Sequence, residues 1–466
     1  MISKKLAIEV LNEMLATGAD YAEIFYEYST GTTVTIENGK VSSSSYNVTS
    51  GAGLRLLKEN RSVYGFTSDV SKKGLLALAR SLNKSFNSPR LLTVNKLEMI
   101  RGKNRNIIKQ SYDDVPLKEK IALVREGTDE IESLKDPRIV RSIGNFGNSH
   151  RHVVIFNSKE KWFSRDTEFA RLVYSVVCAD ENGMETAFQG PGCQMDMSFF
   201  KDKAQPRKVA RKAAETGLMM LTAKECPSGK MPVVIGNGWG GVLFHEACGH
   251  PLEASAVAKG LSCFSGKEGE MIASPIVTAV DDSTIPNEWG SIDIDDEGNP
   301  GEKRVLIKDG KLVNFMIDDF NGRRMNRKGN GACRRQNYQF CPTSRMSNTY
   351  IDNGKSTPEE IIKATKLGLY AVGFAGGSVD PTTGEFNFGC SEAYIIRDGK
   401  VCEPVKGATL IGRGEDILKK IDMVGNDLAL AQGMCGASSG SIRTNVGQPT
   451  LRISEITVGG RGGELK

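Results

Sequence analysis

Two of the chain's four histidines lie five residues apart and flank a glutamate, in the segment His245-Glu246-Ala247-Cys248-Gly249-His250. Neutral imidazole is a common zinc ligand, and a catalytic zinc keeps one position open for water. A glutamate beside a ligand histidine can take the proton from that water. The segment therefore predicts a zinc site with His245 and His250 as ligands and Glu246 as general base. The simpler alternative is two ordinary histidines on a buried turn.

The spacing of the two histidines constrains the local backbone. Residues five apart on an α-helix point about 140° away from each other at 3.6 residues per turn. Two ligands for one metal ion therefore require a widened turn or a break in the helix, and π-type turns occur mostly as single bulges at functional sites. Gly249 makes such a distortion inexpensive, and Pro251 discourages a regular helix beyond it.

A catalytic zinc needs a third protein ligand, and the residues alone leave this ligand open. Glu253 is close in sequence but follows Pro251, so its direction is not fixed by the pattern. Cys435 lies in Gly433-Met434-Cys435-Gly436, which we interpret as a tight loop that exposes a thiol. Cys248 would have to approach the metal awkwardly from between the histidines. Glu253 and Cys435 are thus the leading candidates.

A glycine-rich segment, Gly236-Asn237-Gly238-Trp239-Gly240-Gly241, precedes the histidines and matches the G-x-G-x-x-G pattern of dinucleotide sites. That pattern also requires a second strand ending in Asp or Glu about twenty residues later, and none is present. We therefore reject a nucleotide site. We expect these glycines to give a tight turn and close backbone packing around the histidines.

Composition limits the classes of protein to consider. A chain of 466 residues should form at least two domains. The net charge is only +5, and no basic run is interleaved with aromatic residues, so we expect no nucleic-acid partner. No apolar run is long enough to cross a bilayer. The ten cysteines are scattered without a Cys-x-x-Cys pair, which excludes a disulfide framework and indicates a reduced, cytoplasmic protein.

The order of predicted elements indicates an α+β fold with mainly antiparallel sheets and flanking helices, because strands and helices do not alternate regularly. We predict an N-terminal domain over 1–225, in which 1–100 and 101–225 would be two subregions, and a glycine-rich, metal-binding catalytic domain over 230–466. Three predicted hairpins turn at Asn38-Gly39, Asp309-Gly310 and Asp398-Gly399. Their shared form would fit an internal structural duplication, but we favour recurrence of a common turn chemistry.

His150 and His152 form a second histidine pair, two residues apart on one side of a predicted strand. Such a pair can bind metal. No acidic or thiol partner lies nearby in sequence, so we interpret the pair as a solvated strand end.

The segment from Gly241 to His250, which reads GVLFHEACGH, resembles the signature of the TldD/PmbA family on its TldD side. The resemblance covers essentially the whole chain and is most specific in the C-terminal half. Further matching segments are 264–266, 280–282, 295–298, 345–350, 391–394, 404–412, 423–427, 435–436 and 446–450. The chain departs from the family pattern at Cys248, Pro251 and Ala254.

The resemblance implies a cytoplasmic metallopeptidase with zinc held by His-Glu-x-x-x-His and a distant cysteine. By position these residues are His245, His250 and Cys435, with Glu246 as general base. The family implies unfolded polypeptides or small peptides as substrates. It also implies a dimer, either with a second copy or with a PmbA/TldE-type chain that lacks the histidine motif.

A rival hypothesis is a non-enzymatic peptide-binding or regulatory subunit with a structural zinc. Structural zinc normally has four protein ligands, so Glu253 or Cys248 would have to join the other three.

Overall fold

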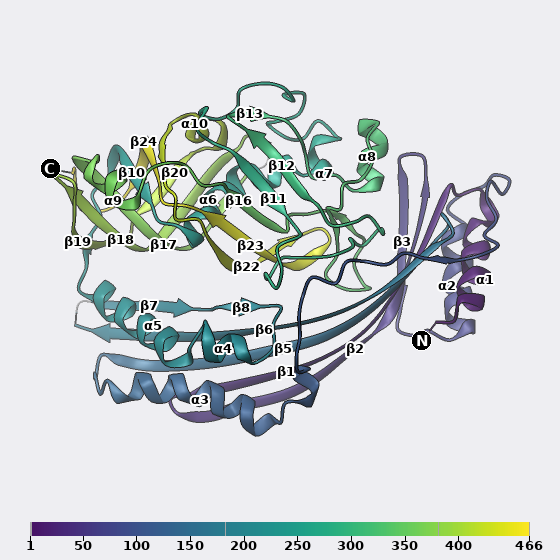
Figure 1. Cartoon of the computed structure of the whole chain (residues 1–466), viewed down its shortest axis with the longest axis horizontal. Coiled ribbons are helices and arrows are strands. Elements are labelled where there is room, and N and C mark those ends of the chain that lie inside the picture. Colours follow the sequence, from purple (N-terminus) through teal and green to yellow (C-terminus); the bar gives the residue numbers. More distant parts are fainter. Residues whose placement is uncertain (1, 182, 381, 466) are drawn as a thin grey trace.

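The computed structural model describes residues 2–465 except 182 and 381. Long antiparallel strands dominate the N-terminal half, and two further sheets form the C-terminal half (Figure 1). Helices are short or lie on the sheets. The predicted α+β class with mainly antiparallel sheets and flanking helices is therefore confirmed.

The N-terminal sheet has its strands in the order β3-β2-β1-β5-β6-β4, with β7 and β8 also paired to β6. Its neighbours β1–β2, β1–β5 and β5–β6 pair antiparallel over most of their length. The strands are β1 (Tyr21–Glu37), β2 (Lys40–Lys58), β3 (Arg61–Thr67), β4 (Glu98–Met99), β5 (Ile139–Asn157), β6 (Lys161–Asp180), β7 (Gly183–Gln189) and β8 (Gly192–Cys193).

Helices cover both ends of this sheet and build two cores. Apolar residues of α1 (Lys4–Met14) and α2 (Lys72–Asn83) pack on β1 and β2 at one end. At the other end α3 (Leu117–Ser133) and α5 (Pro206–Leu221) pack on β5 and β6, next to the short α4 (Ser198–Asp202). Strands of up to 20 residues thus connect two cores through one sheet.

The C-terminal half contains a sheet with the strand path β17-β10-β24-β20-β18-β19-β9, and β21 pairs with β24. An additional pairing of β17 with β18 closes part of this path on itself. The strands are β9 (Lys224–Glu225), β10 (Gly229–Ile235), β17 (Leu367–Val379), β18 (Glu385–Arg397), β19 (Lys400–Lys406), β20 (Thr409–Arg413), β21 (Ile421–Val424) and β24 (Leu451–Gly459).

The other C-terminal sheet has the order β13-β12-β11-β16-β23-β22, so β22 is an edge strand. Its strands are β11 (Ala279–Asp282), β12 (Lys303–Lys308), β13 (Lys311–Leu312), β16 (Asn348–Ile351), β22 (Ala429–Ala437) and β23 (Gly440–Gln448); β14 (Cys333–Arg334) and β15 (Thr343–Ser344) pair separately. The short helices of the C-terminal half are α7 (Ala254–Val257), α8 (Asp319–Met325), α9 (Pro358–Lys363) and α10 (Gly414–Lys419), and α9 and α10 contact strands of the other C-terminal sheet.

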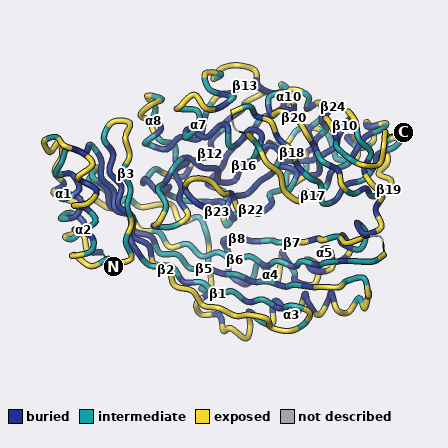
Figure 2. Tube along the Cα trace, turned by 180° about the vertical axis from the view of Figure 1, so that it is seen from behind, coloured by how far each residue is buried: buried dark blue, intermediate teal, exposed yellow. Residues whose placement is uncertain are grey.

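The largest apolar cores each lie within one half of the chain. Figure 2 shows buried segments running through the C-terminal half, where one large apolar core joins both sheets. The outer part of β2 is exposed. No helix in the described part of the chain is long and apolar enough to cross a membrane.

The predicted asparagine-glycine and aspartate-glycine turns are confirmed by left-handed backbone angles. Asn38, Asp309 and Asp398 have φ of 45°, 49° and 48°, and the glycine after each also has positive φ. β1 continues without a break through Ser29-Thr30-Gly31, because β2 and β5 pair with it on both edges across that stretch.

The glycine-rich segment forms a tight turn rather than a nucleotide loop. After β10 it becomes a 3₁₀ turn (Gly238–Gly241) that leads into α6 (Val242–Phe244). A Cβ on Gly241 would lie 2.4 Å from the backbone nitrogen of Gly447 in β23. The expected close backbone packing is therefore confirmed, and it fixes the start of the histidine segment against β23.

Substitution of Gly241 tests this packing. We expect Gly241→Ala to lower the free energy of unfolding by about 1–3 kcal/mol, because the added methyl group meets backbone that cannot rotate away. Gly147→Ala in β5 is the matched control, since a Cβ there meets no atom of the described part of the chain within 4 Å. Urea denaturation of both variants measures the effect, and equal midpoints for the two would contradict it.

Candidate metal centre

The backbone widens where the histidines lie. Residues His245–Gly249 form a π-helical turn, and the N–H of His250 donates to the carbonyl of His245. This i→i+5 bond places the two residues one wide turn apart, so both rings point to the same side. The widening predicted from the spacing is confirmed.

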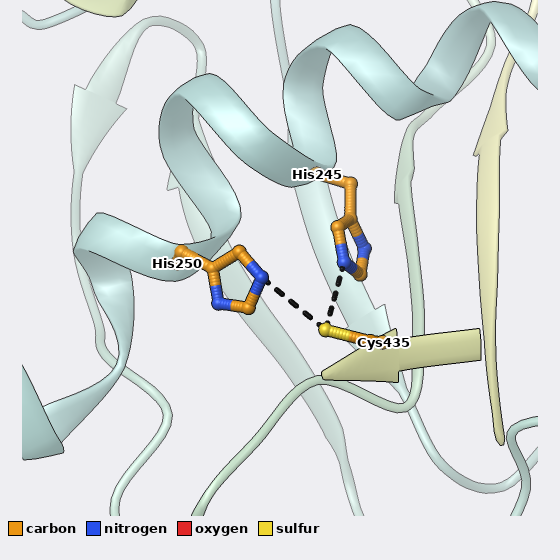
Figure 3. Close-up of side chains that lie close together, drawn as sticks. All are labelled: His245, His250 and Cys435. Atoms are coloured by element: carbon orange, nitrogen blue, oxygen red, sulfur yellow. Dashed lines mark hydrogen bonds between the residues drawn. The ribbon is translucent and has the colours of Figure 1, made fainter. Parts of the chain in front are cut away.

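Both imidazole rings meet one sulfur atom. His245 Nε2 lies 3.3 Å from Cys435 Sγ, and His250 Nε2 lies 3.2 Å from it (Figure 3). The ring centroids are 5.2 Å apart with an interplanar angle of 84°. Among the described residues this is the one group of three or more His, Cys, Asp or Glu side chains whose donor atoms all lie within 4.8 Å of one another.

The donor set fits a metal ion such as zinc. Tetrahedral coordination at ordinary zinc–nitrogen and zinc–sulfur distances separates N and S donors by about 3.5 Å. The two N···S separations here are within a few tenths of an ångström of that value. Both histidines offer Nε2, and Nδ1 of His245 is buried without a hydrogen-bond partner among the described residues. Soft thiolate with imidazole is a donor combination typical of zinc.

The structure corrects the predicted environment of Cys435. We expected an exposed thiol in a tight loop, but Cys435 lies within β22 and is 5% exposed. The chain turns later, between β22 and β23, where Gly440 has φ +86°. Burial opposes ionisation, but the nearby charge of His245 and hydrogen bonds from both histidines lower the pKa of Cys435 to about 3. The thiol is therefore held as a thiolate, the form that binds metal.

Glu253 is close to the site but faces the other nitrogen of a histidine. Its Oε1 lies 3.4 Å from His250 Nδ1, and the residue is buried. Although burial favours the neutral ring, the charge of Glu253 and the contact with Cys435 raise the pKa of His250. A carboxylate at Nδ1 fixes the ring orientation and the tautomer that leaves Nε2 free for a ligand. The geometry thus gives Glu253 an orienting position, outside the three-donor group.

Glu246 lies on the open side of the same turn. Its Oε2 is 3.7 Å from His250 Nε2, and its side chain is 27% exposed, against 14% for His250. A carboxylate in this position is near the three donors and still reachable from solvent. Cys248, in contrast, is fully buried in the apolar core, where burial raises its pKa.

Arg345 is a positioning residue that the sequence reasoning did not single out, although it begins one of the segments matching the family. It is fully buried. Its Nη2 donates to the carbonyl of Cys435 over 2.5 Å, and Nη1 donates to Ser439 Oγ and the Gly440 carbonyl, each over 2.9 Å. Its Nε lies 3.9 Å from Glu253. One guanidinium therefore ties the β22–β23 hairpin to the carboxylate behind His250.

The other histidine pair does not lie at a strand end. His150 and His152 are in the middle of β5. His150 Nδ1 lies 2.9 Å from Asp113, and His152 Nδ1 lies 2.9 Å from Asp166. Acidic side chains distant in sequence thus lie within hydrogen-bonding distance of both rings, a pairing that the local sequence could not reveal. The pair is absent from the metal-binding groups found among the described residues.

The chain is similar to a known protein family along most of its length. Three domain descriptions of one family match along the chain: PmbA/TldA metallopeptidase domain 1 at residues 22–85, the central domain at 110–221 and the C-terminal domain at 228–460.

Curated relatives match over nearly the full length. A metalloprotease TldD homolog of Buchnera aphidicola subsp. Acyrthosiphon pisum is 34% identical, over 97% of this chain and 95% of its own. A metalloprotease TldD homolog of Haemophilus influenzae is also 34% identical, over 98% of this chain and 97% of its own. The crystal structure of TldE from Thermococcus kodakarensis has the same fold, with a TM-score of 0.77 at 19% identity, over 97% of this chain and 99% of its own.

The geometry makes a prediction about metal retention. We expect Cys435→Ser to lose most bound metal on dialysis, because serine is a poor ligand, and Glu253→Gln to retain about one metal ion per chain with weaker affinity. The control is Cys402→Ser, which removes an exposed thiol. Elemental analysis after dialysis measures the metal content. Full metal content in Cys435→Ser with loss in Glu253→Gln would show that the carboxylate is the third ligand.

Proposed function

Because the chain belongs to the TldD/PmbA family of metallopeptidases, we propose that it is a zinc metallopeptidase that hydrolyses peptide bonds in unfolded polypeptides or small peptides. The observation that carries this proposal is the approach of two histidine Nε2 atoms to one cysteine sulfur. The names of its relatives support a metalloprotease; zinc, the general base and the substrate are our proposals.

The proposed division of roles assigns His245, His250 and Cys435 as the zinc ligands. Bound zinc would supply a Lewis acid that polarises a carbonyl and lowers the pKa of water. Glu246 accepts the proton of the attacking water and passes it to the leaving amine. Its partial exposure supports this role, because the carboxylate must reach both water and substrate. Glu253 and Arg345 hold His250 and the Cys435 hairpin in place.

We propose that β22 provides the edge on which substrate lies. It ends the strand order of its sheet and carries Cys435. A peptide added to that edge would pass beside the metal ligands and be held through main-chain hydrogen bonds, which tolerate many sequences. Unfolded chains can adopt this extended form, whereas folded proteins offer few free segments.

The rival function is a peptide-binding subunit with structural zinc. It would need a fourth protein ligand, and the described donor group contains three. The positions of Glu253 at the far nitrogen of His250 and of Cys248 in the core favour the peptidase. Zinc retention without cleavage would favour the binding subunit.

Substitution of Glu246 tests the proposed catalytic mechanism. We expect Glu246→Gln to cleave an unfolded peptide about 10² to 10⁴ times more slowly, because the amide keeps the shape but cannot accept the proton. Its zinc content should match that of the parent. Glu455→Gln, which changes an exposed carboxylate paired with Lys420, serves as the control. Parental cleavage rates in Glu246→Gln would refute the assigned base.

We further propose that the protein acts in the cytoplasm as a dimer, with a second copy or with a TldE-type chain. The likeness to a TldE structure and the ten unpaired thiols support this arrangement. Light scattering should give twice the mass of one chain for the protein alone or for its mixture with the TldE-type chain, and cell fractionation should place it with cytoplasmic enzymes. A monomer under both conditions, or recovery outside the cytoplasm, would contradict the proposal.

A further inference from the structure

A cavity of about 410 Å³ lies between the N-terminal sheet and the β22–β23 hairpin. Figure 1 shows these two parts facing each other across the middle of the molecule. The cavity wall contains two carboxylates, Glu27 and Asp296, and six arginines: Arg151, Arg165, Arg171, Arg334, Arg335 and Arg443. Its volume is in the range of ligand pockets.

Three of these arginines have carboxylate partners. Arg151 Nε lies 2.7 Å from Glu27, and Arg165 Nη2 lies 2.8 Å from Asp296. Arg335 Nη2 lies 2.5 Å from Glu23, a buried carboxylate behind the wall. Both carboxylates of the wall are therefore already neutralised by these pairs.

The other three arginines have no ion-pair partner within the described residues. Arg171 donates to the carbonyls of Gly190 and Gln432, over 2.9 and 3.1 Å. Arg334 donates to the carbonyl of Met346 over 2.5 Å. Arg443 donates to the carbonyl of Trp289 over 3.4 Å, and its guanidinium lies 3.5 Å from the ring centroid of Phe169.

Burying the guanidinium groups of Arg334 and Arg443 near other arginines is electrostatically unfavourable. Arg334 is only 6% exposed. Burial, and then the charge of Arg345, lower its pKa to about 10. Burial likewise lowers the pKa of Arg443, and the charges of Arg334, Arg151 and Arg165 lower it further. A buried charge is costly unless it is paired, so an anion that enters this cavity replaces repulsion with attraction.

The cavity is adjacent to the metal centre along the same hairpin. Met434 and Arg443 are cross-strand partners on β22 and β23, and both line the cavity. Because side chains alternate along a strand, Cys435 next to Met434 points to the opposite face, toward the histidines. A peptide lying along β22 would therefore pass both the metal ligands and the arginines within a few residues.

We propose that Arg171, Arg334 and Arg443 form a binding site for a carboxylate of the peptide substrate, supplied by an Asp or Glu side chain or by the C-terminus. Guanidinium groups bind carboxylates through charge-assisted hydrogen bonds of defined geometry. The inference rests on the proposed peptidase function for the identity of the ligand. The site makes the enzyme selective for acidic peptides, in addition to the sequence-tolerant contacts of the strand edge.

Binding of matched peptides to metal-free protein tests the site without requiring cleavage. Fluorescence anisotropy measures the dissociation constants of labelled unfolded peptides. In one series a single glutamate occupies successive positions of the same peptide, and in the matched series glutamine replaces that glutamate. Each is made with a free and with an amidated C-terminus, which separates the two sources of carboxylate. We expect the best acidic peptide to bind about 10-fold more tightly than its neutral counterpart.

Substitutions of single arginines test which residues cause the preference for acidic peptides. We expect Arg443→Gln and, on the opposite wall, Arg171→Gln to lose the preference, so that the dissociation constants of acidic and neutral peptides differ by no more than about twofold. Both variants should bind the neutral peptide with the same dissociation constant as the parent. Arg141→Gln removes an exposed arginine paired with Glu37 and should keep the full preference, although it makes the same change in net charge. Circular dichroism shows whether each variant is folded. Because the two variants lie on separate walls, the test remains possible if one of them fails to fold.

Equal binding of acidic and neutral peptides by the parent, or a preference that persists in both cavity variants, would overturn the proposal. If the parent shows the arginine-dependent preference but the zinc-loaded protein cleaves none of the peptides, the binding site stands and the peptidase assignment fails.

Discussion

The five-residue spacing between His245 and His250 is the constraint on which the site depends. A regular helix would point the two rings apart, and the π-turn brings both Nε2 atoms to one sulfur. A widened turn lacks the regular hydrogen bonds of an α-helix, so packing against other segments must stabilise it. That support comes from Gly241 against β23, from Gly249 against Met346 and from Gly414 against the carbonyl of Ala247, all at distances that leave no room for a side chain.

The third donor, Cys435, is brought to the site by the pairing of strands that are distant in sequence. Cys435 is 185 residues beyond His250 in the sequence, and its place is set by the register of β22 on β23 and of β23 on β16. Arg345 adds a direct link, because it holds the carbonyl of Cys435 and lies beside Glu253. The same hairpin that presents Cys435 to the histidines presents Arg443 to the N-terminal sheet. One structural element therefore connects the metal centre with the arginine-lined cavity.

Local sequence predicted those features that local chemistry decides. The widened turn follows from the spacing, the close packing of Gly241 follows from the glycine-rich segment, and the hairpin turns follow from Asn-Gly and Asp-Gly. The strand environment of Cys435 and the acidic partners of His150 and His152 depend on contacts across many residues, and no local pattern contains them. The continuity of β1 likewise depends on its partners β2 and β5. Family resemblance identified Cys435 by position but assigned no role to Arg345, Arg171, Arg334 or Arg443.

The most direct test of this account is an anomalous difference map at the zinc edge from crystals of the zinc-loaded protein. We predict one strong peak about 2.0–2.1 Å from Nε2 of His245 and of His250 and about 2.3 Å from Cys435 Sγ, with no fourth protein ligand. A peak coordinated by Glu253 or Cys248 as a fourth ligand would indicate structural zinc. A peak distant from Cys435 would contradict the metal centre proposed here.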